Sequence, residues 1–247
     1  MSWVLTEQDL QDLATGAGIL GTGGGGNPYL GHLHVRELVR AGARITVVAA
    51  SALEDTALIC PVGGMGAPTI SIERLPNGGE YLGALRAIEA AWGLEVTHVS
   101  SIEIGGANAL RPMAVAAQAG LPVVDGDGMG RAFPELQMCT FAIAGLPITP
   151  LALQDVRGNS LLIRQVTSAH WAEQIARAAV VSMGGSAAMV LFCLQAPPLP
   201  PHSDQRDGEP GGTPGSGSAS CPGASPGSSR SHPGAVASAA ALCGQDS

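Results

Sequence analysis

The alternation of hydrophobic and polar residues predicts two helices near the start of the chain. A capping-box-like Thr-x-x-Asp begins at Thr6, and apolar residues at helical spacing follow it. The glycines at 21–26 interrupt this periodicity and end the first helix. Pro28 fits the opening turn of a second helix, which we expect to run to about residue 41.

From residue 45 onward, short apolar runs alternate with amphipathic segments. The runs predicted to form strands are 45–50, 57–62, 96–104, 121–125, 151–156 and 160–166. The segments predicted to form helices are 79–92, 109–119 and 171–183, with a glycine loop at 63–68. This alternation is typical of an α/β protein, and we expect a three-layer α/β/α domain with a mostly parallel sheet.

The composition changes sharply at residue 196. Residues 196–247 contain half of the 18 prolines, and serine and glycine fill most of the rest. Such a segment buries too little apolar surface to offset its chain entropy, so we expect a disordered tail. The change falls close to an apparent strand, which favours a frameshifted continuation over a genuine disordered tail. We therefore expect an α/β domain over 1–195, with a truncated second part beginning at about 165.

Charge and composition exclude several classes of function. The 12 basic residues are all arginine, and without lysine there is no Walker A loop for ATP and no pyridoxal phosphate Schiff base. The formal net charge is −8, and no basic stripe predicts nucleic-acid binding.

The sequence also predicts a cytoplasmic protein. The N-terminal segment lacks the basic and apolar regions of a signal peptide. Five widely spaced cysteines match neither a disulfide framework nor a zinc ribbon. The apolar stretch 178–194 is short for a membrane span, which needs about 20 residues. Because Gly184 and Gly185 interrupt it, we interpret it as the end of a helix, a turn and a buried strand.

The first glycine loop contains two overlapping G-x-G-x-x-G patterns. A dinucleotide fingerprint needs a strand before its first glycine, whereas the preceding segment is helical, so we do not expect NAD binding. Two interpretations of this loop stay open. The backbone of Gly23, Gly24, Gly25 and Gly26, with Asn27, can cradle an anion or a carbonyl oxygen, or the glycines can form a tight turn between packed helices.

His32 and His34 resemble a metal-binding pair in spacing only. They lie in a predicted helix, where positions two apart diverge by about 200°. A shared metal is therefore not expected there.

Residues 122–136 carry the densest set of reactive side chains. An apolar strand delivers Asp125 at its carboxyl end, where open α/β sheets place their ligand sites. Asp125 and Asp127 can accept protons or bind a divalent metal, and Arg131 can hold a carboxylate. Glu135 extends the cluster. The structural alternative is an Asp-Gly turn with solvated acids.

A second candidate cluster follows the preceding strand. Glu103 lies among apolar neighbours, where desolvation would raise its pKa and suit it to proton transfer. Gly105 and Gly106 can expose backbone to a ligand. Asn108 either binds substrate or caps the next helix, and we favour the capping role. If the two strands are neighbours, both clusters open on the same edge of the sheet.

Three motifs together resemble the S-methyl thiohydantoin desulfurase-like family, which is associated with hydantoinase and oxoprolinase enzymes. They are GTGGGGNPYLG at 21–31, EIGGANAL at 103–110 and DGDGMGRAFPELQM at 125–138. The resemblance covers roughly residues 5–195. It implies a three-layer α/β domain followed by a smaller β-rich domain, most of which is missing here. It also implies hydrolysis of a five-membered cyclic thiohydantoin with release of a thiol.

Three hypotheses about function follow. In the first, the chain is a hydrolase of a cyclic amide, in which Glu103, Asp125 or Asp127 activates water and Arg131 holds an acidic substrate group. Glycine-loop amides would stabilise the oxyanion. In the second, the chain is a non-catalytic partner of a hydantoinase-type enzyme or a homo-oligomer. In the third, it is an inactive truncated product.

Overall fold

The computed structural model describes residues 2–192 and 194–195, and the expected tail at 196–247 lies outside this part. The strands are β1 (Ser2–Val4), β2 (Thr46–Ala49), β3 (Leu58–Gly66), β4 (His98–Ser101), β5 (Val123–Asp127), β6 (Leu151–Gln154), β7 (Ser160–Ile163), β8 (Ser186–Val190) and β9 (Leu194–Gln195). The helices are α1 (Glu7–Gly21), α2 (Pro28–Arg40), α3 (Pro68–Glu73), α4 (Glu80–Trp92), α5 (Arg111–Ala119), α6 (Thr140–Ile143) and α7 (Ala169–Ser182), with short 3₁₀ turns η1 (Ala50–Ala52), η2 (Gly106–Ala109) and η3 (Leu136–Met138).

The described strands form one mixed sheet in the order β1-β2-β5-β4-β3-β8-β6-β7, and β9 also pairs with β3. The neighbours β2, β5, β4 and β3 run parallel, as the sequence pattern predicts. The outer strands pair antiparallel. Strands β6 and β7 are also antiparallel, because the connection between them is too short to join parallel strands. The α/β prediction is confirmed. The sheet is mixed and not mostly parallel, because among the described strands only the neighbours β2, β5, β4 and β3 run parallel to one another.

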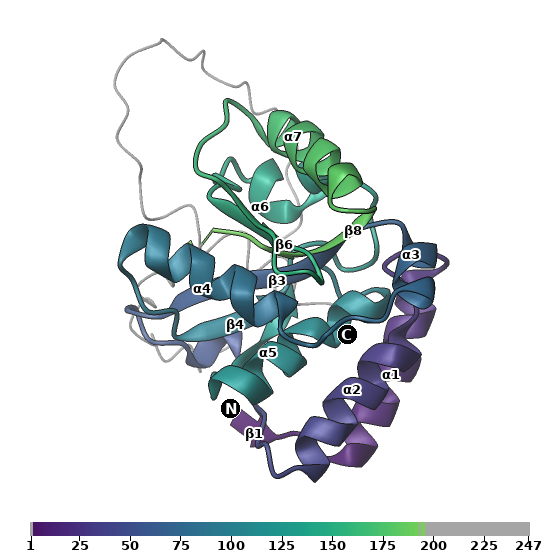
Figure 1. Ribbon diagram of the computed structural model, residues 1–247. Coiled ribbons are helices and arrows are strands. Elements are labelled where there is room, and N and C mark those ends of the chain that lie inside the picture. Colours follow the sequence, from purple (N-terminus) through teal and green to yellow (C-terminus); the bar gives the residue numbers. More distant parts are fainter. Residues whose placement is uncertain (1, 193, 196–247) are drawn as a thin grey trace, which may run out of the picture.

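Helices cover both faces of the sheet (Figure 1). One hydrophobic core lies under α1, α2, α4 and α5 and contains Leu10, Val35 and Leu85. The other lies under α6 and α7 and contains Phe141 and Ala176. The three-layer arrangement is the usual way for a sheet that is apolar on both faces to exclude water.

The N-terminal helices begin as the sequence predicts. Thr6 caps α1 and forms a reciprocal capping box with Asp9, whose carboxylate accepts from the Thr6 amide at 2.8 Å. Pro28 lies in the first turn of α2. The stretch 178–192 forms the end of α7, a turn at Gly184 and Gly185, and β8.

The glycine loop predicted at 63–68 is wrong, because β3 continues to Gly66. Gly63, Gly64 and Gly66 belong to the strand, and residues 62–66 pair with β8. A side chain at Gly63 would collide with Ile102, and one at Gly64 would collide with the guanidinium of Arg111. Glycine in the interior of a strand often marks such close approach of another group.

The first glycine loop packs directly against the turn that follows β4. The Ala107 amide donates to the Gly25 carbonyl at 2.9 Å and to the Gly26 carbonyl at 3.2 Å. Gly106 has a φ of +72°, and an added Cβ would lie 2.6 Å from the carbonyl carbon of Gly25. This contact joins the α1–α2 pair to the carboxyl end of the sheet.

We expect Gly106→Ala to lower the free energy of unfolding by about 2–5 kcal/mol, from left-handed strain and overpacking together. Gly120 is a matched control, because its φ is +71° and no atom lies within 4 Å of an added Cβ. Gly120→Ala should therefore lower the free energy of unfolding by only about 1–2 kcal/mol, the cost of the left-handed strain alone. Urea unfolding of both variants measures the difference, and equal losses would disprove tight packing at Gly106.

Candidate functional site

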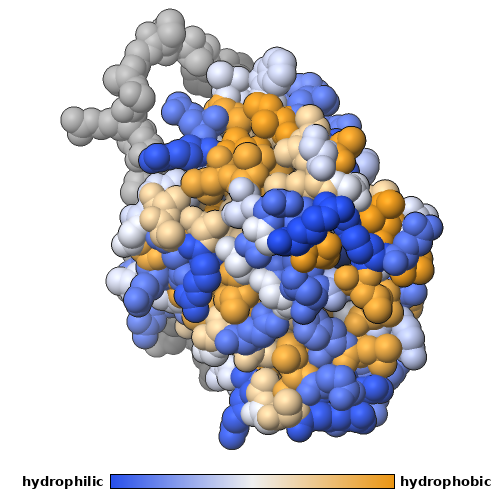
Figure 2. All heavy atoms as spheres, viewed as in Figure 1, coloured by the Kyte–Doolittle hydropathy of each residue, from blue (hydrophilic) through white to orange (hydrophobic). Residues whose placement is uncertain are grey.

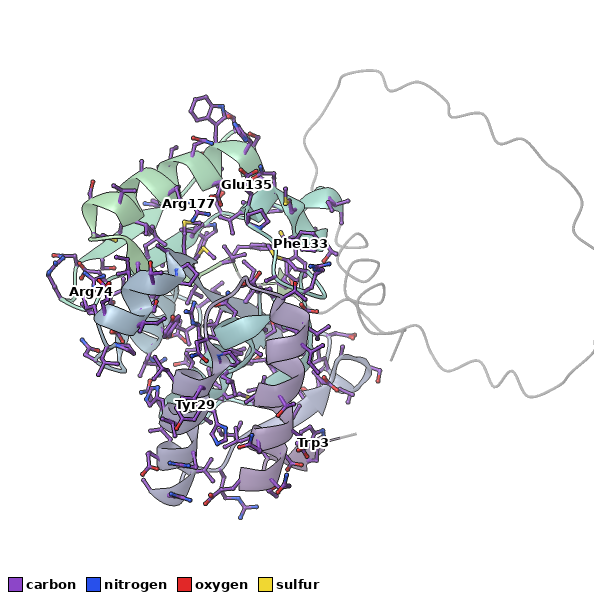
Figure 3. All side chains as sticks on the ribbon, turned by 90° about the vertical axis from the view of Figure 1, so that its right-hand side faces the viewer. Trp3, Tyr29, Arg74, Phe133, Glu135 and Arg177 are labelled. Carbon is purple, nitrogen blue, oxygen red and sulfur yellow. The ribbon has the colours of Figure 1, made fainter. Side chains whose placement is uncertain are left out.

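A cavity of about 340 Å³ opens at the carboxyl ends of the parallel strands β3, β4 and β5. The glycine loop 24–26 and the end of β3 form part of its wall, and the segments after β4 and β5 add acidic and basic side chains. Helix α7 closes it from the other face of the sheet. In Figure 3, Phe133 and Glu135 lie below α7, the helix that carries Arg177. Open α/β sheets place ligand sites in this position.

Glu103 is a buried acid in the wall of this cavity, with 5% of its surface exposed. One carboxylate oxygen accepts a hydrogen bond from the side-chain amide of Asn108, and the other accepts from the Phe133 amide at 3.1 Å. Burial raises the pKa of Glu103, an effect only partly opposed by these two donors and by the positive charge of Arg111. A carboxyl group with a raised pKa is suited to both accept and return a proton.

Asn108 connects Glu103 to the rest of the site. Its side-chain oxygen accepts from the Gly64 amide at 2.9 Å and from the guanidinium of Arg111. The expectation that Asn108 caps the following helix is wrong. Helix α5 begins at Arg111, and its cap residue Leu110 makes no side-chain hydrogen bond.

Arg111, which the sequence analysis missed, is the cation nearest to this acid. Its guanidinium lies over the Tyr81 ring, 5.2 Å from the centroid, and packs on Gly64. Within residues 2–192 and 194–195, Arg111 forms no ion pair with a carboxylate. The cavity therefore contains a positive charge that is available to a negatively charged group of a ligand. In sequence it is a single arginine three residues after Asn108, at the start of a helix, and nothing in this local pattern marks it as a cavity residue.

Asp127 lies behind Glu103 and not in the cavity wall. A single carboxylate oxygen accepts from the amides of Ile104 at 2.8 Å, Met129 at 3.2 Å and Gly130 at 2.7 Å. Burial raises the pKa of Asp127, against the effect of these amides. The observed contacts give Asp127 the role of joining the loops that follow β4 and β5.

The structure does not bring Asp125 or Arg131 into the cavity. Asp125 is exposed and lines a separate pocket of about 90 Å³ between β1, α1 and α5. Arg131 is exposed, donates to the Thr22 hydroxyl at 2.8 Å and lies over the Phe133 ring. Glu135 does line the cavity, where it accepts from the side chain of Gln137.

Some of the glycines predicted to bind substrate line the cavity, and the others lie outside its wall. Gly24, Gly25 and Gly26 line the cavity, whereas Gly23 does not. Gly105 and Gly106 lie behind this wall and allow the glycine loop to approach closely. This packing supports the tight-turn interpretation without excluding a ligand contact.

Asn27 caps α2 by accepting from the Tyr29 amide at 2.9 Å. It also lines an adjoining cavity of about 110 Å³, which shares Ser71, Arg111 and Ser186 with the main one. A ligand larger than the main cavity therefore has space to extend towards α2.

Helix α7 contributes an ion pair, Glu173 with Arg177, that sequence reasoning missed. Glu173 is 3% exposed and accepts from Arg177 at 2.8 Å and from the Leu136 amide at 3.1 Å. Arg177 also donates to the Pro134 carbonyl at 2.9 Å. These bonds hold the segment 134–136 against the cavity.

The described residues contain no group of three or more His, Cys, Asp or Glu placed to hold a metal ion. His32 and His34 both lie in α2, as predicted, and His32 is buried. Among the same residues, no helix has the length and apolar character needed to cross a membrane.

The sequence profile of the S-Me-THD-like N-terminal domain matches residues 8–165, more than half of the chain. The chain belongs to the S-Me-THD-like family. It is also similar to the crystal structure of a structural-genomics target protein from Chromobacterium violaceum, with 28% sequence identity and a TM-score of 0.66. The match covers 77% of this chain and 54% of that one, so this chain spans about half of the other protein's length. A comparison with curated proteins finds no match.

The S-Me-THD-like N-terminal domain supplies most of the cavity but not all of it. Glu103, Asn108 and Arg111 lie inside the matched region, together with the glycine loop. Glu173 and Arg177 on α7 follow residue 165, as do the cavity residues of β8. Segments on both sides of that boundary therefore build one site.

We expect Glu103 to make stability depend on pH in the S-Me-THD-like domain. Because its pKa is raised, the folded state holds its proton at a pH where the unfolded chain has lost it. The resulting stabilisation is present below the ordinary carboxyl pKa and disappears as the pH rises through the folded-state value. We therefore expect the free energy of unfolding of Glu103→Gln to increase relative to that of the wild type as the pH rises. Urea unfolding at pH values from 4 to 8 measures this difference. A constant difference would contradict the raised pKa.

Proposed function

We propose that this chain is a hydrolase, or part of one, that acts on a five-membered cyclic amide such as an S-methyl thiohydantoin or a hydantoin. The observation that carries the proposal is a buried acid, Glu103, in the wall of a cavity that also contains Arg111, a cation without an ion pair in the described part of the chain. Family membership supports the substrate class by resemblance. Arg111 takes the role that the sequence analysis assigned to Arg131.

In the proposed reaction, Glu103 removes a proton from water, and the oxygen forms a bond to the ring carbon that carries the methylthio group. The electron pair of the carbon–nitrogen double bond moves to the ring nitrogen, which receives the second proton of the water. The carbon–sulfur bond then breaks, and Glu103 returns its proton to the departing methanethiolate. A carbonyl replaces the methylthio group, and no oxidant or reductant is needed.

Arg111 supplies the electrostatic part of the mechanism. Negative charge develops on the ring and on the sulfur in a site that is partly shielded from water, where a fixed cation stabilises it more than water would. Stacking on Tyr81 and packing on Gly64 hold the guanidinium in place before the substrate arrives. Little reorganisation is then needed during the reaction.

We expect Glu103→Gln to lower kcat for thiol release by about 10²–10⁴-fold, the usual contribution of a general acid–base residue. The assay measures methanethiol released from S-methyl thiohydantoin by the 247-residue chain, by mass spectrometry, so that the protein's own thiols do not interfere. Asp125→Asn is the comparison, because Asp125 lies outside the cavity and this variant should retain most of the activity. The opposite ranking would transfer the catalytic role to Asp125. A folded wild-type chain that released no thiol would favour the inactive-product hypothesis.

A second candidate function is that of a non-catalytic partner of a hydantoinase-type enzyme. The specific observation is exposed apolar surface on α6 and α7, where Ile143 is 74% and Val181 69% exposed. Figure 2 shows hydrophobic residues gathered at the surface near these helices. Isolated domains rarely expose large apolar patches without a binding role.

If this surface binds a partner, Ile143→Glu with Val181→Glu should weaken association with a hydantoinase-type enzyme at least tenfold. Sedimentation of the purified proteins, separately and mixed, measures the association. Glu103→Gln should leave it unchanged, since Glu103 is buried in the cavity wall. A chain that sediments alone in the mixture would rule this candidate out.

A further inference from the structure

Asn108 lies between the two charged groups of the cavity. Its side-chain N–H donates to Glu103, and its side-chain oxygen accepts from Arg111 and from the Gly64 amide at 2.9 Å. These partners come from the loop after β4, from α5 and from β3. With 3% of its surface exposed, Asn108 is shielded from water that would otherwise compete for these bonds.

Only a carboxamide meets this set of partners. Glu103 needs a donor, whereas Arg111 and the Gly64 amide need an acceptor, and the asparagine side chain provides both. A carboxylate of the same shape keeps the acceptors but has no hydrogen to donate, so it forms a hydrogen bond with Glu103 only if one of the two acids is protonated. A hydroxyl is too short to reach all three groups at once.

The surrounding contacts hold this bridge in place. The Ser101 hydroxyl, which is buried, donates to the backbone carbonyl of Asn108 at 3.1 Å and to that of Glu103. Arg111 is held by the Tyr81 ring and by Gly64, so its guanidinium does not have to follow changes at Asn108. Glu103 is held at its second oxygen by the Phe133 amide.

We propose that Asn108 is the positioning residue of the site. It holds the Glu103 carboxyl at a fixed place beside the Arg111 guanidinium, so that the acid serves proton transfer and the cation serves the charge that forms on the substrate. The catalytic purpose of this positioning rests on the proposed function. The geometry of the bridge does not depend on which substrate is bound.

The charged groups that act on Glu103 are Arg111 from α5 and Asp127 at the end of β5. A substitution at Asn108 removes neither of these two charges. In Asn108→Asp, a carboxylate takes the place of the donor, so loss of the hydrogen bond and like-charge repulsion both favour the protonated form of Glu103. In Asn108→Ser only the hydrogen bond is lost, and the effect has the same sign but is smaller.

The test follows the titration of Glu103 itself, by ¹³C NMR of protein labelled at glutamate side-chain carboxyls. The Glu103 signal is identified by its absence in Glu103→Gln. We expect Asn108→Asp to move its apparent midpoint upward by about one pH unit or more, as for interacting carboxyls. Gln118→Glu is the matched control, because it makes the same change from amide to acid at an exposed residue of α5 and should not move the midpoint.

The same variants are then assayed for thiol release across pH. The acidic limb of kcat/KM should move upward together with the NMR midpoint, whereas a merely structural role would lower the melting temperature and leave both unmoved. An unmoved midpoint in Asn108→Asp overturns the proposal, and if that variant does not fold, an unmoved midpoint in Asn108→Ser does so. A shifted midpoint in a protein that releases no thiol overturns the proposed function and leaves the Asn108 bridge intact.

Discussion

The approach of two glycine-rich backbone segments holds the site together. The loop after α1 and the turn after β4 come so close that Gly25 and Gly106 leave no room for a side chain. Hydrogen bonds from Ala107 to the loop fix their separation. Because Glu103 directly precedes this turn, the same contact that joins the α1–α2 pair to the sheet also shields the acid from water, and burial is the main cause of its raised pKa.

Glu103 differs from the other acids buried in the described part of the chain. Glu80 accepts from the amides of Asn77 and Gly78, and Asp155 accepts from two amides and an asparagine side chain in the turn between β6 and β7. Glu173 forms an ion pair with Arg177. Each of these acids uses its hydrogen bonds or ion pair to fix a turn or a loop. Glu103 is instead held by one neutral side chain and one amide beside a cavity.

Local pattern was enough to predict most of the fold. Capping at Thr6, the proline that opens α2 and the alternation of strands with helices are properties of neighbouring residues, and they match the structure. The extension of β3 through its glycines was not predictable in this way, because it depends on what packs against them. Turn chemistry predicts a loop there, and only the opposing Ile102 and Arg111 explain a strand.

The candidate site was only partly predictable, because several of its residues come together through tertiary packing and not through local pattern. Glu103 was found because an acid among apolar residues is visible in one segment. Asp125 and Asp127 looked equivalent in sequence, yet one is exposed and the other is enclosed by three backbone amides. Arg111 and the α7 pair reach the cavity only through tertiary packing, and a lone arginine at the start of a helix carries no signal of that.

The pairing of β8 with β3 has a consequence for how this family can be divided. The matched domain ends at residue 165, but β3 lies inside the sheet because β8, from residues 186–190, forms hydrogen bonds along its second side. A fragment that stopped at the domain boundary would turn β3 into an edge strand. It would expose unpaired backbone groups on a glycine-rich strand with few side chains to block another chain, the condition under which sheets add foreign strands and aggregate. The boundary drawn from sequence similarity is therefore not a boundary at which this protein can be cut.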